Sequence, residues 1–289
     1  MQSGSASSSW AHTRNSLKYA RQLAHKVNCS SQSDSASMIA CLRTVSAKKL
    51  TAASWPMGNE PITALAEFYF VPTVDGIFVK DDPLTLMNSQ TYLKQVGLQK
   101  LDCMVSAVSN EGGIYKFLAR AADNQFHVSS SSSVQHKAFY RNTFIPEVLQ
   151  VYFGTSSSDM TQAVAKVYAP SQSHTVNLQT VMNTLGDAGM VVPVMQFARA
   201  HAKLSSSLKT GKKTYMYVFD HIPSFMSGHG MGLDHGDDLM CTFGLNKAYM
   251  AALAKTFSNS TMEPDQSEKE LAHTVMGLLT DFARHGYVR

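Results

Sequence analysis

The sequence predicts an α/β protein whose strands form a mainly parallel sheet. Two compact apolar runs, residues 102–108 and 214–219, are typical of buried strands, and each is followed by a polar loop. Apolar residues at helical spacing occur before, between and after these runs. Strands that alternate with helices indicate a sheet covered by helices, and chemistry in such a sheet is expected in the loops at the strand ends.

The first hundred residues predict helices followed by a turn. Apolar residues recur at helical spacing from Leu17 to Val27, and a second short helix is expected around Met38–Leu42. Residues 68–71 and 76–79 are predicted to be short extended pieces on either side of the turn sequence Pro72–Gly76. These elements precede the first strand expected in the sheet.

Helices and loops are expected to follow each of the two strands. Residues 114–121 are expected to form a helix after the first strand. The five serines at 129–133 are expected to form a flexible loop. A long helix with an early proline is predicted over residues 187–204. Residues 227–236 are expected to form a loop rich in glycine and histidine after the second strand. The last helix is expected to begin with a capping box at Ser267–Glu270.

Composition and charge limit the partners of the chain. The 289 residues carry a net charge of +4, and their lysines and arginines are scattered, so we expect no nucleic-acid partner. No apolar run approaches the roughly 18 residues that a membrane span needs, so none is expected within this chain. Two sequons, at Asn28 and Asn259, are either glycosylation sites in a secretory setting or chance triplets in a serine-rich chain.

The four cysteines lie in two kinds of surroundings. Cys29 and Cys41 bracket a short polar segment, so a disulfide between them would close a small surface loop and contribute roughly 3 kcal/mol of stability. Cys103 and Cys241 lie in apolar runs, which favours buried free thiols. If the chain is secreted, we expect the first pair to be bonded and the second pair to stay reduced.

The densest group of polar residues lies between His229 and Asp238. It is compatible with three interpretations: a solvated surface loop, a zinc or manganese site, or a loop that presents His235 as a general base. A metal site needs at least three convergent ligands, and no HExxH-type spacing is present. Residue spacing alone leaves all three open, with the solvated loop the commonest outcome.

Glu111 is the carboxylate that best completes the third interpretation. It follows the first strand in a glycine-flanked loop, although a loop glutamate taken alone is more often merely solvated. In α/β-hydrolases the chain order is nucleophile, acid, histidine, and Glu111 and His235 fit the last two places. The sequence contains no Gly-x-Ser-x-Gly turn and no His-Gly-Gly-Gly loop, so these residues lack the expected nucleophile and oxyanion motifs.

Several segments, taken in order along the chain, resemble type-B carboxylesterases and cholinesterases. They are Gln2-Ser3-Gly4, the Cys29–Cys41 loop with its Cys-Leu-Arg ending, Pro72-Thr-Val-Asp-Gly76, Asn110-Glu111-Gly112, His235-Gly-Asp-Asp-Leu239 with Phe243-Gly244, and Asp281-Phe-Ala-x-x-Gly286. The resemblance covers essentially the whole chain with sensible spacing. It implies an α/β-hydrolase fold of which this chain holds the later part of a mainly parallel sheet with flanking helices.

The resemblance implies a serine ester hydrolase with Glu111 and His235 as the acid and base of its catalytic triad. Asp238 stands where the family usually has a glutamate, so it would be a shorter supporting carboxylate behind the histidine. The resemblance also implies a disulfide between Cys29 and Cys41. A small ester is the implied substrate, and neither a metal ion nor a cofactor is expected.

The family's serine and oxyanion glycines precede the segment at which residue 1 falls. Residues 1–289 are therefore expected to form a single partial carboxylesterase-type domain that lacks the N-terminal part with the nucleophile elbow. We expect this domain to belong to a longer secreted hydrolase whose signal peptide lies upstream. The alternative is a non-catalytic adhesion or binding protein on the same fold, and the presence of both Glu111 and His235 argues against it.

Overall fold

The computed structural model describes residues 1–30, 34–54, 68–115, 137–170, 176–224, 233–244, 250–251 and 263–287. The chain divides into two compact units. The first unit contains residues 1–5, 84–117 and 178–289, and the second contains residues 6–83 and 118–177. The single partial domain expected from the sequence stays a prediction.

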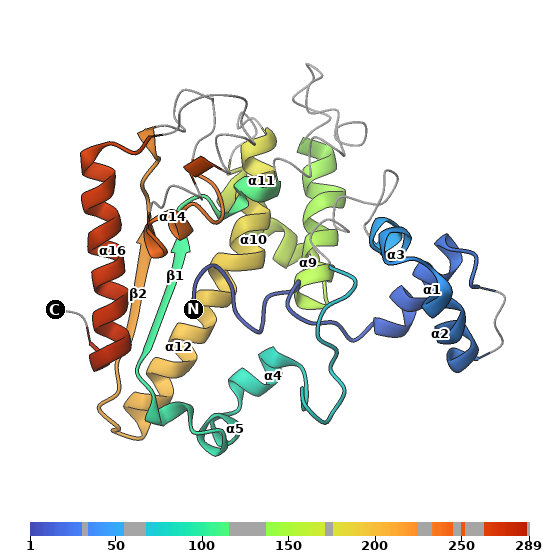
Figure 1. The fold of residues 1–289 in the computed structure, drawn as a ribbon, viewed down its shortest axis with the longest axis horizontal. Helices are drawn as coiled ribbons and strands as arrows, with labels where there is room; N and C mark the ends of the chain where they lie inside the picture. The colour runs from blue at the N-terminus through green and yellow to red at the C-terminus, as the bar shows by residue number, and fades with distance from the viewer. Residues whose placement is uncertain are drawn as a thin grey trace. The chain divides into compact units, whose positions relative to one another are not determined.

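The first unit is built on two parallel strands, β1 (Cys103–Val108) and β2 (Thr214–Phe219), which pair along their full lengths (Figure 1). The N-terminal segment pairs with β1 on the edge that β2 leaves open. There the N–H of Ser106 donates to the Met1 carbonyl at 2.9 Å, and the N–H of Ser3 donates to the Ser106 carbonyl at 2.8 Å. The predicted strands and their parallel arrangement are therefore confirmed.

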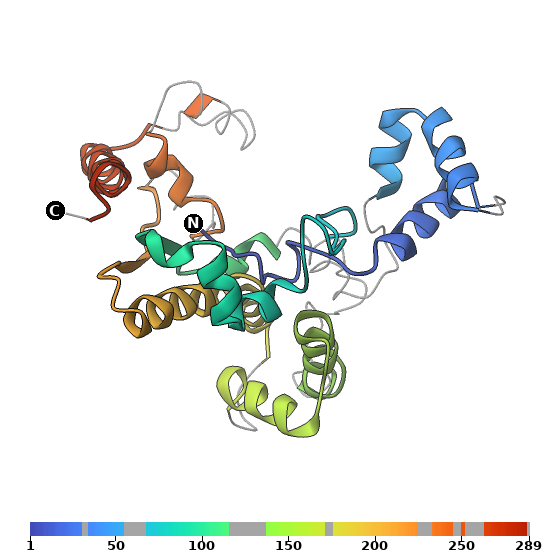
Figure 2. The same cartoon turned by 90° about the horizontal axis from the view of Figure 1, so that it is seen from below.

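Helices cover both faces of this sheet (Figures 1 and 2). The helical elements are α4 (Pro83–Asn88), α5 (Gln90–Gln95), η2 (Leu98–Lys100), η3 (Glu111–Gly113), α11 (Leu178–Gly186), η5 (Asp187–Val191), α12 (Val192–Ser207), α14 (Asp238–Thr242) and α16 (Gln266–His285). Val194 of α12 packs with Val105 of β1, whereas Ala272 of α16 packs with Val108. Because side chains alternate along a strand, residues 105 and 108 face opposite sides, so α12 and α16 lie on different faces.

Burial differs between the two strands. β1 is buried from Met104 to Val108, as predicted. Along β2 only Phe219 is buried, and Met216 and Val218 are 42% and 56% exposed. The prediction of a buried second strand is wrong in this respect because β2, within the described residues, pairs with β1 alone and so lies at the edge of the sheet.

The long helix after the acid loop is longer than predicted. Helices α11 and α12 are joined without a break by the π-helical turn η5, so helical structure runs from Leu178 to Ser207. Pro193 stands in the first turn of α12. Because helical structure precedes it, Pro193 removes one backbone hydrogen bond to the preceding turn, and the π turn η5 lies at this point of the helix.

The capping box of α16 lies two residues earlier than predicted. Asp265 is the N-cap, and its Oδ1 accepts the N–H of Glu268 at 2.9 Å. In return, Oε2 of Glu268 accepts the N–H of Asp265 at 2.9 Å. The spacing of a capping residue followed three positions later by glutamate occurs at both Asp265 and Ser267, so spacing alone cannot separate the two.

Within the described residues, the helices of the second unit are its main secondary structure. They are α1 (Ser16–Lys26), α2 (Ser35–Thr44), α3 (Ala47–Ser54), the π turn η4 (Tyr140–Phe144), α9 (Ile145–Phe153) and α10 (Ser158–Tyr168). The two helices predicted in the first fifty residues correspond to α1 and α2. The predicted extended pieces around residues 68–79 are bends instead, with an isolated bridge between Thr13 and Thr73. The predicted turn is present, since Oδ1 of Asp75 accepts the N–H groups of residues 77–79.

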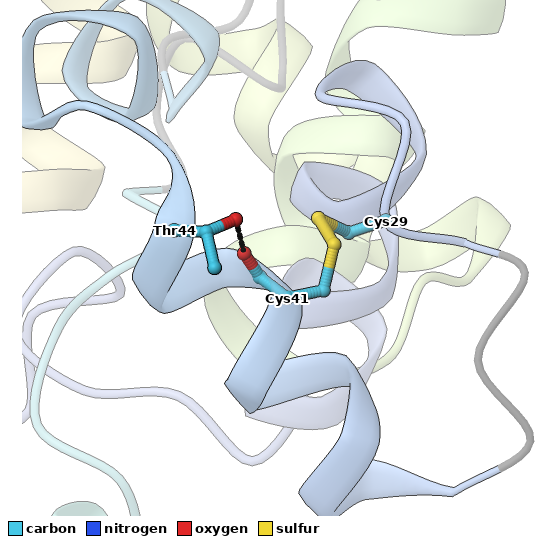
Figure 3. The surroundings of a disulfide bond; sticks show 3 residues. All are labelled: Cys29, Cys41 and Thr44. Carbon is cyan, nitrogen blue, oxygen red and sulfur yellow. Dashed lines mark hydrogen bonds between the residues drawn. A yellow bond between two sulfur atoms is a disulfide. The ribbon is translucent and has the colours of Figure 1, made fainter.

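A disulfide joins Cys29 to Cys41, with their Cα atoms 5.7 Å apart (Figure 3). It links the end of α1 to α2, and the Cys41 carbonyl accepts the hydroxyl of Thr44 at 2.8 Å. Cys29 is 1% exposed and belongs to the small core between these helices. Cys103 and Cys241 are free thiols, and Cys103 is only partly buried rather than buried as expected.

Some of the sequence predictions lie outside the described residues. These are the serine loop at 129–133, the predicted helix beyond Tyr115, residues 227–232 with His229, and the sequon at Asn259. Among the residues that are described, no helix is both long enough and apolar enough to cross a membrane.

Candidate active site

Glu111 and His235 meet at the edge of the sheet where the strands end. Glu111 lies in η3, three residues after β1, and His235 lies in the turn that leads into α14. The carboxyl ends of neighbouring parallel strands share one edge, so the segments that follow them can converge. Nδ1 of His235 lies 2.6 Å from Oε2 of Glu111, although 124 positions separate the two residues.

The carboxylate of Glu111 is buried and has a partner for each oxygen. Oε1 accepts the N–H of Val108 at 2.9 Å, and Oε2 faces His235. The side chain of Glu111 is 1% exposed, whereas the imidazole of His235 is 27% exposed. Because an ionised carboxylate only accepts hydrogen bonds, the neutral imidazole carries its proton on Nδ1 and keeps a lone pair on Nε2. The pair therefore presents a base whose orientation is fixed from behind.

Charges around the imidazole favour its protonated form. The hydrogen bond to Glu111 raises the pKa of His235 above its ordinary value, and the charges of Glu111, Asp238 and Asp234 act in the same direction against the effect of burial. Burial raises the pKa of Asp237 to about 6. Burial and the charge of Glu111 also raise the pKa of Asp238, while His235 opposes them. The site therefore stabilises an imidazolium once it forms.

The glycines that flank Glu111 allow close packing of the acid loop. A Cβ atom at Gly112 would lie 2.0 Å from the carbonyl oxygen of Met182 in α11, and one at Gly186 would lie 2.3 Å from the nitrogen of Gly112. A Cβ atom at Gly113 would lie 2.3 Å from Oδ1 of Asp234. At these positions only glycine leaves room for the neighbouring backbone and side chains to approach so closely. In the sequence, the glycine pair after Glu111 was the feature that indicated such packing.

Asp238, the expected supporting carboxylate, contacts the N-terminal segment. It is 2% exposed, and its Oδ2 accepts from Nε2 of Gln2 at 3.0 Å. Nε2 of Gln2 also lies within 3.2 Å of the Tyr217 hydroxyl and 3.0 Å of Oγ1 of Thr242. Gln2 was not predicted as a site residue, because nothing in its local sequence places it beside α14.

Two other sequence predictions can be located. Asn28 is exposed beside the disulfide, with a φ of 66°, and its glycosylation stays a prediction. In the described part of the chain, no three or more histidine, cysteine or acidic side chains are arranged as a metal site. The structure gives His235 of the histidine loop a carboxylate partner, and the role of His235 as a general base stays a prediction.

The parallel strands, the flanking helices and the acid–histidine pair at the strand ends define an α/β-hydrolase type of protein. The model of the carboxylesterase family matches residues 1–287, and the chain belongs to this family. The crystal structure of a carboxylesterase from Geobacillus stearothermophilus superposes with a TM-score of 0.59 at 16% identity, over 99% of this chain and 48% of that one. The predicted partial α/β-hydrolase fold is therefore confirmed.

The relatives of this chain include proteins named as a lipase, as an esterase and as a neuroligin. The chain is 27% identical to bile salt-activated lipase of Mus musculus and 26% identical to acetylcholinesterase of Bungarus fasciatus, each over 99% of this chain. It is 28% identical to neuroligin-2 of Rattus norvegicus, also over 99% of this chain. The chain spans 43%, 42% and 31% of the lengths of these three relatives.

Proposed function

We propose that this chain is the acid- and histidine-bearing part of a secreted serine carboxylic ester hydrolase. The observation that carries the proposal is the 2.6 Å contact between Oε2 of Glu111 and Nδ1 of His235 at the strand-end edge of the sheet. Membership of the carboxylesterase family supports the reaction class. Because the sequence holds no Gly-x-Ser-x-Gly turn, we place the nucleophilic serine in a segment outside these 289 residues.

In this mechanism His235 transfers the proton, and Glu111 holds the imidazole of His235 in place. Nε2 of His235 accepts the serine hydroxyl proton as the serine oxygen bonds to the ester carbonyl carbon. The proton then passes to the alcohol oxygen as its bond to that carbon breaks, which leaves the acyl group on the serine. A water molecule repeats both steps and releases the acid. Glu111 stays ionised throughout and stabilises the imidazolium through the Nδ1 hydrogen bond.

Residues around the pair have supporting parts in the proposal. Asp238 adds a buried negative charge that favours the imidazolium, and Gln2 holds that carboxylate. The substrate is a small ester, and the reaction uses no metal ion or cofactor. The Cys29–Cys41 disulfide supports secretion, since such bonds persist in oxidising compartments. Asn28, exposed beside the disulfide, and Asn259 are the proposed glycosylation sites.

A second candidate function is a non-catalytic adhesion or binding protein on the same fold. The observation that favours it is the similarity to neuroligin-2, a relative that is not named as an esterase or a lipase. The short, partly buried contact between Glu111 and His235 weighs against it, since a binding surface does not need a carboxylate aligned with an imidazole.

Hydrolysis of a chromogenic short-chain ester tests the proposed function. The 289-residue chain is compared with a polypeptide that extends it upstream through the family's nucleophile segment. We expect turnover by the extended polypeptide alone, and we expect His235→Ala to lower kcat by about 10⁴-fold or more. His273→Ala is the matched control, because His273 is exposed on α16 and its loss should leave kcat unchanged.

Two outcomes would overturn parts of this proposal. Turnover by the 289-residue chain that is lost in His235→Ala would show that the nucleophile lies within these residues. An extended polypeptide that folds but hydrolyses no ester would favour the adhesion-like alternative.

A further inference from the structure

Asn110 lies between the loop that carries Glu111 and the loop that carries His235. Its Nδ2 donates to the carbonyl oxygen of Leu233 at 2.6 Å, across 123 positions of sequence. Its Oδ1 accepts from Nε2 of Gln179 in α11 at 3.2 Å. A backbone carbonyl can only accept, so the amide group that faces Leu233 has to be the NH₂ end. The Leu233 carbonyl by itself therefore fixes which end of the amide faces the histidine loop.

The local role expected of this asparagine is not the one it has. Asn110 is the N-cap of η3, a position where an asparagine side chain commonly accepts a hydrogen bond from its own helix. Here the side chain makes no capping hydrogen bond. Its hydrogen-bonding groups are used instead on Leu233 and Gln179, which belong to other elements.

The bond to Leu233 attaches the acid loop to an anchored point of the histidine loop. Leu233 is 4% exposed and packs in the core cluster that contains Val108 and Phe219, the last residues of β1 and β2. It stands two positions before His235. Asn110 and Glu111 are neighbours, so adjacent residues of one loop contact two nearby points of the other. Two such contacts restrain both the separation of the loops and their rotation.

Two further hydrogen bonds of the histidine loop act within it. Oδ2 of Asp237 accepts the N–H of Asp234 at 2.7 Å, and Oδ1 of Asp234 accepts the N–H of His235 at 2.7 Å. These bonds shape the turn but do not attach it to the acid loop. The carboxylate of Asp234 also lies close to Gly113 of the acid loop, where a Cβ atom would be 2.3 Å from Oδ1 of Asp234.

We propose that Asn110 is a positioning residue, which holds the histidine loop against the acid loop and so keeps the hydrogen bond between Glu111 and His235 formed. The consequence for catalysis rests on the proposed function, whereas the coupling between the two loops does not. Without the Asn110 amide, the Glu111–His235 bond would be formed for a smaller fraction of the time. The pKa of His235 would then fall toward its ordinary value, because that bond is the main cause that raises it.

Titration of His235 by NMR in the 289-residue chain tests the coupling. The charged groups that act on its imidazole are Glu111 from η3, Asp234 and Asp237 from its own loop and Asp238 from α14, and all four are retained in the variants. Asn110→Leu keeps the side-chain size but removes the donor, and it is expected to lower the pKa of His235. Gln179→Ala removes the contact on the other side of Asn110 and is the matched control with an unchanged pKa. His235→Ala assigns the resonance.

A second variant keeps the test decisive if Asn110→Leu does not fold. Asn110→Ser shortens the side chain, so that the donor no longer reaches the Leu233 carbonyl, without adding apolar surface. It is expected to lower the pKa of His235 as well. A pKa equal to that of the unsubstituted chain in a folded Asn110 variant would overturn the proposal. A fall of equal size in Gln179→Ala would overturn it as well, because the effect would not then depend on the bond to Leu233.

Kinetics separate this inference from the proposed function. In the extended polypeptide, Asn110→Leu is expected to lower kcat about tenfold and to change KM by less than about twofold, since it misplaces the base without touching substrate. The acid limb of the kcat profile should move to lower pH along with the pKa of His235. If the extended polypeptide has no esterase activity but the pKa falls as expected, the proposed function fails and the positioning role stands.

Discussion

Oε2 of Glu111 and Nδ1 of His235 lie 2.6 Å apart across 124 positions of sequence. Their meeting depends on the parallel pairing of β1 with β2, which brings the segments after both strands to one edge of the sheet. The buried carboxylate accepts a backbone N–H as well, whereas the imidazole is partly exposed. Glu111 is thus fixed in the core, and the imidazole of His235 is accessible from outside.

Removing the charge of Glu111 should cost most of the activity of the extended polypeptide. Glu111→Gln keeps the shape of the side chain, but its amide cannot stabilise an imidazolium and can favour the wrong tautomer of His235. We expect kcat for a short-chain ester to fall by about 10³- to 10⁴-fold. Glu270→Gln, at an exposed position of α16, is the control. A loss smaller than about tenfold in Glu111→Gln would contradict the role of Glu111 as the triad acid.

The dependence of activity on pH follows from the pKa of His235. A general base acts in its neutral form, so activity is lost as the pH falls through that pKa. Because Glu111 raises it, the acid limb of kcat/KM should lie above the ordinary value for histidine. In Glu111→Gln the residual activity should have its acid limb at lower pH. A limb at the same pH in both proteins would show that another group titrates.

Gly186→Ala should destabilise the fold although alanine favours helices. Its Cβ would lie 2.3 Å from the nitrogen of Gly112, and the clash should exceed the gain of about 1 kcal/mol in helix propensity. We expect a net loss of about 1–3 kcal/mol in urea unfolding. Gly277→Ala in α16 is the control, because its Cβ meets nothing within 4 Å, and it should stabilise by up to about 1 kcal/mol. Equal effects of the two changes would contradict the close packing.

Asp237→Asn should stabilise the chain at neutral pH and not at acid pH. Burial raises the pKa of Asp237 to about 6 in the folded state from an ordinary value of 3.8. Because the pKa of Asp237 is higher in the folded state, its contribution to folding stability is fully present below the unfolded-state pKa of 3.8. That contribution is lost as the pH rises through the folded-state pKa of about 6. The asparagine side chain carries no charge at either pH, so the variant avoids this loss. Urea unfolding at pH 4 and pH 8 measures it, and an equal difference at both would refute the assignment.

The disulfide should contribute to the stability of the second unit. Replacing Cys29 and Cys41 together by serine is expected to lower the unfolding free energy by about 2–3 kcal/mol, because the closed loop is short. Cys103→Ser is the control, since Cys103 is a free thiol that is only partly buried. If the double variant unfolded at the same urea concentration as the unsubstituted chain, the disulfide would contribute little to the unfolding free energy.

Local patterns in the sequence predicted the strands and the order of the two catalytic candidates. The runs at β1 and β2 are short, apolar and followed by polar loops, and Glu111 precedes His235 in the family's order. The exposure of Val218 was not predictable, because it depends on which strands lie beside β2. The capping residue of α16 was ambiguous, since Asp265 and Ser267 share the same spacing to a glutamate.

Long-range side-chain contacts were beyond the reach of the sequence. The bond between Asn110 and Leu233 and the contact of Gln2 with Asp238 each join segments more than a hundred residues apart. Such contacts are set by tertiary packing and leave no periodic signal. The family resemblance included Asn110 and Gln2 in its motifs without indicating what either side chain touches.

The most direct test of the central claim is the identity of the residue that an organophosphonate probe labels in the extended polypeptide. Mass spectrometry of the digested protein is expected to find a single labelled serine within a Gly-x-Ser-x-Gly segment upstream of Gln2. Its labelling rate should fall by about 10³-fold or more in His235→Ala and stay unchanged in His273→Ala. No labelled serine, or labelling at the same rate without His235, would contradict the claim that Glu111 and His235 activate a nucleophile.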